Sequence, residues 1–354
     1  MRRIPDDRAR QALTSRTLVR ARAPLRVSFA GGGTDVPPFP EDEGGLILSA
    51  TIARYAHATL QPRDDRQISL ESLDFGLSVD FGMDEPMLFD GRLDLVKSAI
   101  ARFLDRENTG FDLYLHSSAP PGSGLGSSSA MIVALVGLLQ NHYRMTMTDY
   151  EIAHVAHVLE REDLGISGGL QDHYAATFGG FNYLELSGDH VVVNPLRIGP
   201  DTISELEHNL LLCYTGRTRL SDHIIDDQTE RYLRGDSDAI DGLRMQKRLA
   251  QEMKDALLRN RLSDFGDLLG QAWQQKRRMS PRIATPFIDE AYQLARDHGA
   301  LGGKVTGAGG GGYMLFYCPY NRRHHVAEAL MKHGLTVTEI SFELTGLRTW
   351  RVDG

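Results

Sequence analysis

Cysteine and tryptophan are scarce in this chain, with only two of each among 354 residues. The two cysteines, Cys213 and Cys318, are too few for a disulfide framework and lack the spacing of metal-ligating pairs, so a reducing cytoplasm is the predicted compartment. The chain also lacks an excess of positive charge. Its formal net charge is -8, whereas a nucleic-acid surface requires clustered lysine and arginine, so nucleic acid is not predicted as a partner.

Long apolar runs are absent as well, and none comes near the roughly 20 residues that a membrane span requires. No membrane partner is therefore predicted. The segment from Met1 to Arg22 is rich in arginine, but Asp6 and Asp7 interrupt it, and it lacks the apolar centre of a secretion signal. We expect residues 1–16 to be a flexible lead-in. The whole composition, 41% hydrophobic and 24% charged, is typical of a globular protein, and the length allows two domains.

The most informative stretch is the glycine- and serine-rich segment from Pro120 to Ala130, which precedes an apolar run from Met131 to Leu139. This order predicts a loop that leads into a buried helix. Backbone N–H groups at a helix N-terminus have no intrahelical partner, and the helix dipole adds partial positive charge, so the position favours a polyphosphate. A P-loop is excluded because no lysine follows the glycines, and the glycine spacing does not fit a dinucleotide fingerprint.

A loop of this composition is commonly only a connection, but the complete string from Pro120 to Ala130 resembles the phosphate-binding motif of the GHMP kinases. The resemblance implies a kinase with ATP and Mg²⁺ as cofactors. It predicts that ATP is bound by Pro121, Gly122, Ser123, Gly124, Leu125, Gly126, Ser127, Ser128 and Ser129.

The same resemblance implies two ligands for Mg²⁺. Ser128 is the first, and the second is a glutamate on a helix shortly before the catalytic loop. Helical periodicity places Glu160 and Glu162 at opposite edges of one apolar stripe and leaves both open. The spacing to Asp172 in the family favours Glu160.

The resemblance also predicts the catalytic residues. Asp172 follows a glycine break and matches the proposed catalytic base of galactokinase-like members, and His173 stands where those members usually carry glutamine. Phosphoryl transfer needs charge offset at the attacking hydroxyl, and the family supplies this cation from the first strand, where Arg26 is the match. Without the resemblance, Arg26 could equally be a surface arginine.

Two further glycine blocks match the family. Residues 31–35 lie where galactokinases have an acidic and histidine-containing block, but here glycines replace the glutamate and histidine, which counts against galactose. Residues 304–312 resemble the family's C-terminal glycine motif. Together with the catalytic loop they predict a sugar site formed by Gly32, Gly33, Thr34, Asp35, Gly169, Gln171, Asp172, Arg219, Lys304, Gly309 and Gly310.

Features outside the shared motifs are similar to the D-glycero-D-manno-heptose 7-phosphate kinases, a branch that serves nucleotide-activated heptose biosynthesis. These features are residues 31–35, residues 169–176, residues 214–216 with Arg219, and Trp273 and Lys276 with residues 302–304. The resemblance implies transfer of the γ-phosphate of ATP to the anomeric C1 hydroxyl of the heptose 7-phosphate, giving the 1,7-bisphosphate. Cationic anchors are expected for the 7-phosphate, and the candidates are Arg217, Arg219, Lys276, Arg277 and Lys304.

Three alternatives stay open at this point. The chain could be a GHMP kinase of another free sugar, such as fucose, galactose or a hexosamine. It could be a catalytically inactive sugar sensor, although such a sensor need not keep Asp172, Arg26 and the central loop. It could also be a binding protein whose glycine loops are only turns. A homodimer is allowed, but no pattern in the sequence predicts one.

Interleaved strand and helix patterns predict an α+β fold rather than an all-helical one. The resemblance implies an N-terminal domain like the second domain of ribosomal protein S5 and a ferredoxin-like C-terminal domain, with the active cleft between them. The predicted domain ranges are residues 17–204 and 205–354, divided near a segment from Pro200 to Glu207. A Thr148–Glu151 capping box predicts the start of one helix.

Overall fold

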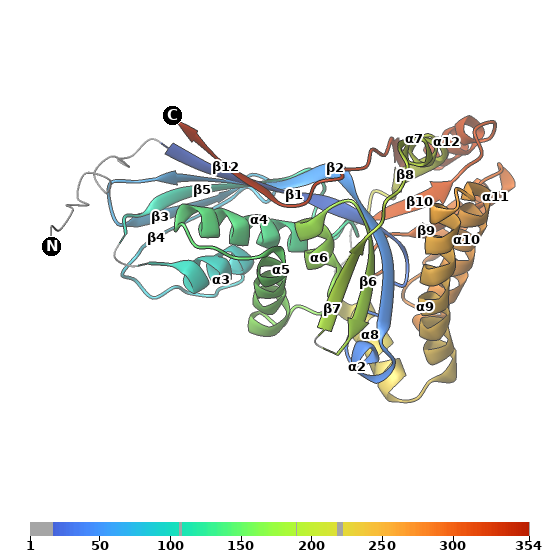
Figure 1. Cartoon of the computed structure of the whole chain (residues 1–354), viewed down its shortest axis with the longest axis horizontal. Helices are drawn as coiled ribbons and strands as arrows, with labels where there is room; N and C mark the ends of the chain where they lie inside the picture. The colour runs from blue at the N-terminus through green and yellow to red at the C-terminus, as the bar shows by residue number, and fades with distance from the viewer. Residues whose placement is uncertain (1–16, 106–107, 189, 218–221, 354) are drawn as a thin grey trace, which may run out of the picture.

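The structure is a computed structural model that describes residues 17–105, 108–188, 190–217 and 222–353. Two antiparallel-dominated sheets organise these residues, and helices cover them (Figure 1). The predicted lead-in of residues 1–16 and the predicted site residue Arg219 lie outside the described residues.

The larger sheet has eight strands among the described residues, in the order β12-β1-β2-β5-β3-β4, with β6 and β7 attached to β2. Of the pairings that the structure describes in this sheet, only β3–β5 is parallel. Its strands are β1 (Thr17–Ala30), β2 (Gly45–Pro62), β3 (Gln67–Ser72), β4 (Leu77–Gly82), β5 (Phe111–Ser117), β6 (Phe181–Ser187), β7 (His190–Pro195) and β12 (Arg348–Asp353).

Helices pack below this sheet in Figure 1, and α4 (Ser127–His142) is the central one. Its apolar run is buried on all sides, with Ile132, Leu135 and Leu139 fully inaccessible, as expected for a helix without a polar face. The other elements here are α2 (Phe39–Glu43), α3 (Asp94–Phe103), α5 (Asp149–His157), the π-helix η1 (Val158–Asp163) and α6 (Gln171–Phe178). The predicted capping box is confirmed, because Thr148 and Glu151 cap the start of α5 reciprocally.

The smaller sheet has the strand order β11-β8-β10-β9. Numbered along the chain, this is the order 4-1-3-2 with antiparallel neighbours, which defines a split βαβ, ferredoxin-like arrangement and confirms the prediction for the second half. Its elements are α7 (Pro200–Asn209), β8 (Leu210–Tyr214), α8 (Asp222–Leu233), α9 (Ser237–Leu258), α10 (Leu262–Met279), α11 (Pro286–Asp297), β9 (Gly302–Val305), β10 (Tyr313–Tyr317), α12 (Arg323–Lys332) and β11 (Thr336–Thr338).

The two halves are joined more closely than the sequence predicted. The segment chosen as the domain boundary is the helix α7, and the division after residue 204 falls inside it. The last strand, β12, pairs with β1 and so lies in the first sheet. One apolar cluster contains Leu25 and Leu135 from the first half and Leu212 and Phe265 from the second. The division at residue 204 therefore stays a prediction. Among the described residues, the helices include none that is both long enough and apolar enough to traverse a bilayer.

Candidate active site

A cleft of about 350 Å³ lies where the two halves meet. Its lining comes from the end of β1, the loop after β5, the start of α6, the helices α8 and α10, and the glycine loop after β9. A second, more open hollow between the C-terminal end of α4 and β12 contains none of the predicted site residues. The cleft is therefore the candidate active site.

The loop before α4 forms one wall of this cleft. Gly122, Gly124 and Gly126 have φ angles of 70°, 80° and 72°, a backbone conformation that favours glycine. A Cβ on Gly124 would lie only 2.5 Å from the carbonyl oxygen of Thr306, so the glycine also allows the two glycine loops to touch. Of the nine residues predicted to bind ATP, those that line the cleft are Pro121, Gly122, Gly124, Gly126, Ser127, Ser128 and Ser129.

The other two residues predicted to bind ATP form hydrogen bonds inside the protein and do not line the cleft. Leu125 accepts a hydrogen bond from the backbone N–H of Arg26, and Ser123 accepts one from that of Tyr313, each through its carbonyl oxygen. Neither residue belongs to the cleft lining. These bonds fix the loop to β1 and β10 and leave the N-terminus of α4 facing the cleft.

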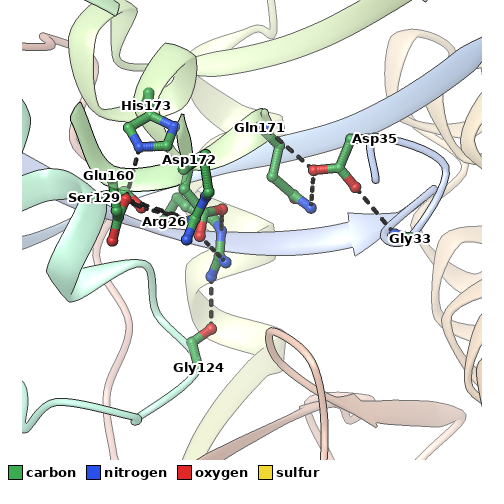
Figure 2. Close-up of polar contacts among 10 residues, drawn as sticks. Arg26, Gly33, Asp35, Gly124, Ser129, Glu160, Gln171, Asp172 and His173 are labelled. Atoms are coloured by element: carbon green, nitrogen blue, oxygen red, sulfur yellow. Dashed lines mark hydrogen bonds and ion pairs between the residues drawn. The ribbon is translucent and has the colours of Figure 1, made fainter. Parts of the chain in front are cut away.

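Asp172 and Arg26 form a two-pronged ion pair beside this loop (Figure 2). Arg26 Nε lies 2.7 Å from Asp172 Oδ1, and Nη2 lies 2.8 Å from Oδ2. The remaining guanidinium nitrogen donates to the carbonyl oxygen of Gly124 over 2.6 Å. A bidentate pair of this kind fixes the plane of the carboxylate as well as its position. The sequence prediction that Arg26 accompanies Asp172 agrees with this geometry.

Glu160 lies at the back of the cleft on η1 and is only 1% exposed. Its Oε2 accepts hydrogen bonds from the Ser129 hydroxyl over 2.6 Å and pairs with His173 Nε2 at 2.7 Å (Figure 2). Burial alone would raise the pKa of Glu160, but the His173 hydrogen bond and the charge of Arg161 outweigh it and hold this pKa below its ordinary value. Glu162, by contrast, is exposed.

The fit of a divalent cation can be judged from these donors. Ser128 is exposed in the cleft lining, and its hydroxyl lies close enough to help lower the pKa of Glu160. Mg²⁺ commonly takes one or two protein oxygens and completes its shell with phosphate oxygens and waters. The described residues contain no cluster of three or more acidic, histidine or cysteine ligands, so an all-protein cage is not built here. A charged carboxylate and a hydroxyl beside the N-terminus of α4 do fit an Mg²⁺ ion that would complete its shell with ligand oxygens and waters.

Asp35 occupies the opposite side of the cleft and is 1% exposed. It accepts hydrogen bonds from the N–H of Gly33 and from both the N–H and the side-chain amide of Gln171, at 3.0–3.1 Å (Figure 2). Burial raises the pKa of Asp35, and the nearby charge of Asp172 raises it further. Gly169 also lines the cleft, and no larger residue fits there because a Cβ would collide with the Asp35 carboxylate.

Three predicted sugar-binding residues are not brought to the cleft surface. Thr34 donates its hydroxyl to the carbonyl oxygen of Gly31 and fixes the turn. Lys304 is buried and donates to the carbonyl oxygen of Phe29 over 3.0 Å, and burial lowers its pKa well below the ordinary value. Gly310 bonds to Ile283 through its backbone N–H, whereas its neighbour Gly309 does line the cleft.

Of the candidate phosphate anchors, the structure brings some to the cleft and not others. Lys276 lines the cleft. Arg277, one residue later, pairs with Asp289 at 3.1 Å, and Arg217 stacks over the Phe287 ring at 5.3 Å. Neither arginine is part of the cleft lining in the described residues.

Sequence reasoning missed several cleft residues. Ser28 lies two positions after Arg26 on β1, and strand alternation could have placed it on the same face. Arg161 donates to Ser129 and to the carbonyl oxygens of Ile166 and Ser167, and no spacing signal pointed to it. Gln228, which donates to the Gly33 carbonyl oxygen from α8, was equally hidden.

Comparison with known proteins agrees with this arrangement. The family model for the GHMP kinases N terminal domain matches residues 94–180, and that for the GHMP kinases C terminal region matches residues 253–334. A D-glycero-alpha-D-manno-heptose 7-phosphate kinase from Campylobacter jejuni is 37% identical over 338 residues, which cover 94% of this chain and 99% of that protein. The chain therefore belongs to the GHMP kinase family, and it is a phosphotransferase that uses ATP.

Solved structures extend the comparison. A D-glycero-D-manno-heptose 1-phosphate kinase from Bacteroides thetaiotaomicron superimposes with a TM-score of 0.80 at 33% identity, covering 95% of this chain and 100% of that one. Lactococcus lactis galactokinase in complex with galactose gives a TM-score of 0.74 at 16% identity, covering 94% and 95% of the two chains. The second likeness shows the shared fold alone. The predicted α+β GHMP kinase fold is thereby confirmed.

Proposed function

We propose that this kinase phosphorylates the anomeric C1 hydroxyl of D-glycero-D-manno-heptose 7-phosphate, giving the 1,7-bisphosphate for nucleotide-activated heptose biosynthesis. The observation that carries the proposal is the near-full-length similarity to the Campylobacter jejuni kinase named for this substrate. The cleft supports the chemistry, because Asp172, Arg26 and the N-terminus of α4 face the same space.

The phosphates of ATP bind the loop before α4 in this proposal. The backbone N–H groups at the start of α4 and the positive end of its dipole offset the phosphate charge. Arg161 adds a guanidinium beside Ser129, and Gly126 supplies the positive φ angle with which the loop enters α4 next to Asp172. A magnesium ion held by Ser128 and Glu160 would neutralise charge that develops between the β- and γ-phosphates.

Asp172 is the base that takes the proton from the C1 hydroxyl. Arg26 holds the Asp172 carboxylate from one side, so the sugar reaches this carboxylate from the cleft side. The same guanidinium offsets negative charge on the attacking oxygen. Asp35, fixed by Gln171 and Gly33, accepts hydrogen bonds from sugar hydroxyls on the opposite wall.

We also propose that the protein acts in the cytoplasm, since Cys213 and Cys318 are both buried and unpaired. A homodimer is a prediction that light scattering of the purified protein would test. A kinase of a free sugar is the second candidate, because the glycines at positions 31–33 do not themselves select a phosphorylated acceptor.

The test of the substrate is ATP consumption with a panel of acceptors, followed by NMR of the product to locate the new phosphate. The panel contains heptose 7-phosphate, heptose 1-phosphate, unphosphorylated heptose, mannose, fucose, galactose and N-acetylhexosamines. Turnover of the 7-phosphate with new phosphate on C1 is the expected result. Turnover of a free sugar alone would replace the heptose phosphate as substrate, and no turnover of any acceptor would contradict catalysis.

A further inference from the structure

Three buried polar side chains converge on one point of the cleft without forming hydrogen bonds to one another. Ser28, Gln171 and Lys276 are 3%, 8% and 4% exposed, and all three line the cleft. The point on which they converge lies above Gly32. A Cβ built on Gly32 would lie 3.5 Å from Ser28 Oγ, 3.7 Å from Lys276 Nζ and 3.8 Å from Gln171 Nε2.

Each of these side chains carries an unused polar atom. Ser28 Oγ and Gln171 Oε1 are buried and have no hydrogen-bond partner. Lys276 Nζ likewise has no hydrogen bond to any residue that the structure describes. A buried polar atom that lacks a partner costs about 1–3 kcal/mol, so two such atoms beside an ammonium group without a hydrogen bond mark a place that suits a ligand.

The hydrogen-bonding pattern restricts what that ligand can be. Gln171 Nε2 donates to Asp35, and this fixes Oε1 as the free atom of the amide. Lys276 and Ser28 therefore offer donors above Gly32. The Gln171 atom nearest to this point is Nε2, and the unpartnered Oε1 of the same amide adds an acceptor next to these donors. A hydroxyl group both donates and accepts, whereas a phosphate dianion only accepts and would repel the Gln171 oxygen.

The charges of the cleft floor point the same way. Lys276 lies near Asp35, and Arg26 is paired with Asp172, so two cations face two carboxylates. Burial lowers the pKa of Lys276 to about 8, while the charge of Asp35 acts in the opposite direction. Lys304 also interacts with Lys276, but it lies outside the cleft lining, and burial lowers its pKa well below the ordinary value. The charges at the cleft surface are therefore balanced, whereas a phosphate dianion binds where positive charge is in excess.

We propose that Ser28, Gln171 and Lys276 form a subsite above Gly32 that binds hydroxyl groups of the acceptor sugar and not its phosphate. This proposal rests on the proposed function, since it takes the acceptor to be a sugar. It removes Lys276 from the candidate phosphate anchors and makes it a residue that recognises the sugar ring. Gly32 is then the floor of the subsite, because a methyl group there would fill the space of the ligand oxygen without colliding with the protein.

Three variants test the subsite with two acceptors, heptose 7-phosphate and unphosphorylated heptose. Lys276→Met should lower kcat/KM about 10- to 100-fold, by the same factor with both acceptors, since it deletes a charged hydrogen bond to the sugar. Ser28→Ala should lower it about 5-fold with both. Gly32→Ala should fold normally and raise KM for both. Calorimetric titration of each acceptor without ATP should show the same losses in binding.

Ser49→Ala is the matched control. Ser49 is the cross-strand partner of Ser28 and is also buried without a hydrogen-bond partner, but it does not line the cleft. Its variant should keep the kinetic constants of the wild type. Melting temperatures close to the wild type for Ser28→Ala and Ser49→Ala would show that any kinetic difference comes from the ligand.

Two outcomes would overturn the subsite. A loss confined to the 7-phosphate acceptor would return Lys276 to the phosphate, and unchanged constants in Lys276→Met and Ser28→Ala would remove both from substrate contact. A wild-type protein inactive with both heptoses contradicts the proposed function instead. In that case the same ratios, measured with the acceptor found in the panel, still decide whether these side chains hold the sugar.

Discussion

A single arginine side chain connects Asp172 with the glycine loop before α4. Arg26 is 4% exposed and spends all three of its guanidinium nitrogens on Asp172 and Gly124. The alternation of β1 could show which face Arg26 occupies, but the sequence could not show that this side chain also reaches the glycine loop before α4. That contact depends on the turn of Gly124, which brings its carbonyl oxygen toward β1.

Asp172→Asn should lower kcat by about 10²- to 10⁴-fold, because the amide cannot take the proton of the acceptor hydroxyl. The variant keeps one oxygen for Arg26, so it should fold and bind ATP. Stopped-assay kinetics and nucleotide titration would measure both properties. Asp149→Asn, an exposed change at the start of α5, serves as control, and turnover of Asp172→Asn within tenfold of the wild type would refute the base.

Glu160→Gln should raise the Mg²⁺ concentration needed for half-maximal activity by about tenfold or more, because the buried charge in the cleft is lost. Glu162→Gln is the matched control on the same turn and should leave the requirement unchanged, since its side chain is exposed. Binding of Mn²⁺ in the presence of ADP, followed by electron paramagnetic resonance, gives a readout independent of turnover. Equal behaviour of the two variants would place the metal ligand elsewhere.

At the scale of elements, hydrophobic periodicity predicted most of the structure. Apolar alternation marks β1 and β5, a short apolar run marks β8, and helical periodicity after Pro286 marks α11. The segment of α7 was predicted to be a boundary because a new buried strand, β8, begins directly after it. The strands β9 and β12 were not predicted. The strand β9 begins with two glycines, and three of the six residues of β12 are charged, so neither has an apolar pattern. Their pairing depends on β10 and β1, which no local pattern reveals.

The C-terminal end of α4 makes stability depend on pH. His142 packs against the Phe111 ring in the last turn, and burial, followed by the charge of Arg351, lowers its pKa to about 4. The unfolded chain takes up the proton below about pH 6.5, whereas the folded protein does so only near pH 4. The stability is therefore complete above pH 6.5 and is lost as the pH falls toward 4.

His142→Phe removes this titration. As the pH falls from 6.5 to 4, the wild type loses stability through His142 and the variant does not. The unfolding free energy of the variant should therefore rise relative to that of the wild type by up to about 3 kcal/mol. Urea unfolding at several pH values measures it, with pH 8 as the baseline at which the ring is neutral in both states. A constant difference across this range would show that His142 does not contribute.

At the scale of the whole molecule, the cleft exists only because distant segments meet. The resemblance could point to Asp172 and the glycine loops, since each lies in a contiguous motif, and to Glu160 through its spacing from Asp172. It could not find Ser28 and Lys276 as neighbours, because they are separated by most of the chain and meet only through the docking of α10 on β1. Nor could the sequence predict that Lys276 lines the cleft whereas Arg277 pairs with Asp289, since helix packing sets the direction of each side chain.

Removal of residues 348–354 tests how far the first sheet depends on β12. The strand covers the edge of β1 with six paired residues, and its Thr349 and Arg351 are hydrogen-bonded to Asn141 of α4. We expect a loss of at least about 2 kcal/mol in unfolding free energy and a greater tendency to aggregate through the exposed edge. Calorimetry and light scattering would measure both, and an unchanged melting temperature would show that β12 is dispensable.

The bond from Arg26 to Gly124 also has a thermodynamic consequence. Any ligand that shifts the Gly124 carbonyl changes the restraint on the Asp172 carboxylate, because one guanidinium holds both. We therefore expect the affinities for nucleotide and acceptor to be linked. Reciprocity requires that the nucleotide changes acceptor affinity by the same factor as the acceptor changes nucleotide affinity. Four titrations measure this coupling free energy, namely those of the nucleotide with and without acceptor and of the acceptor with and without nucleotide, and both pairs should give the same value. Arg26→Lys should reduce this coupling free energy, because a lysine cannot hold Asp172 and Gly124 in the same plane.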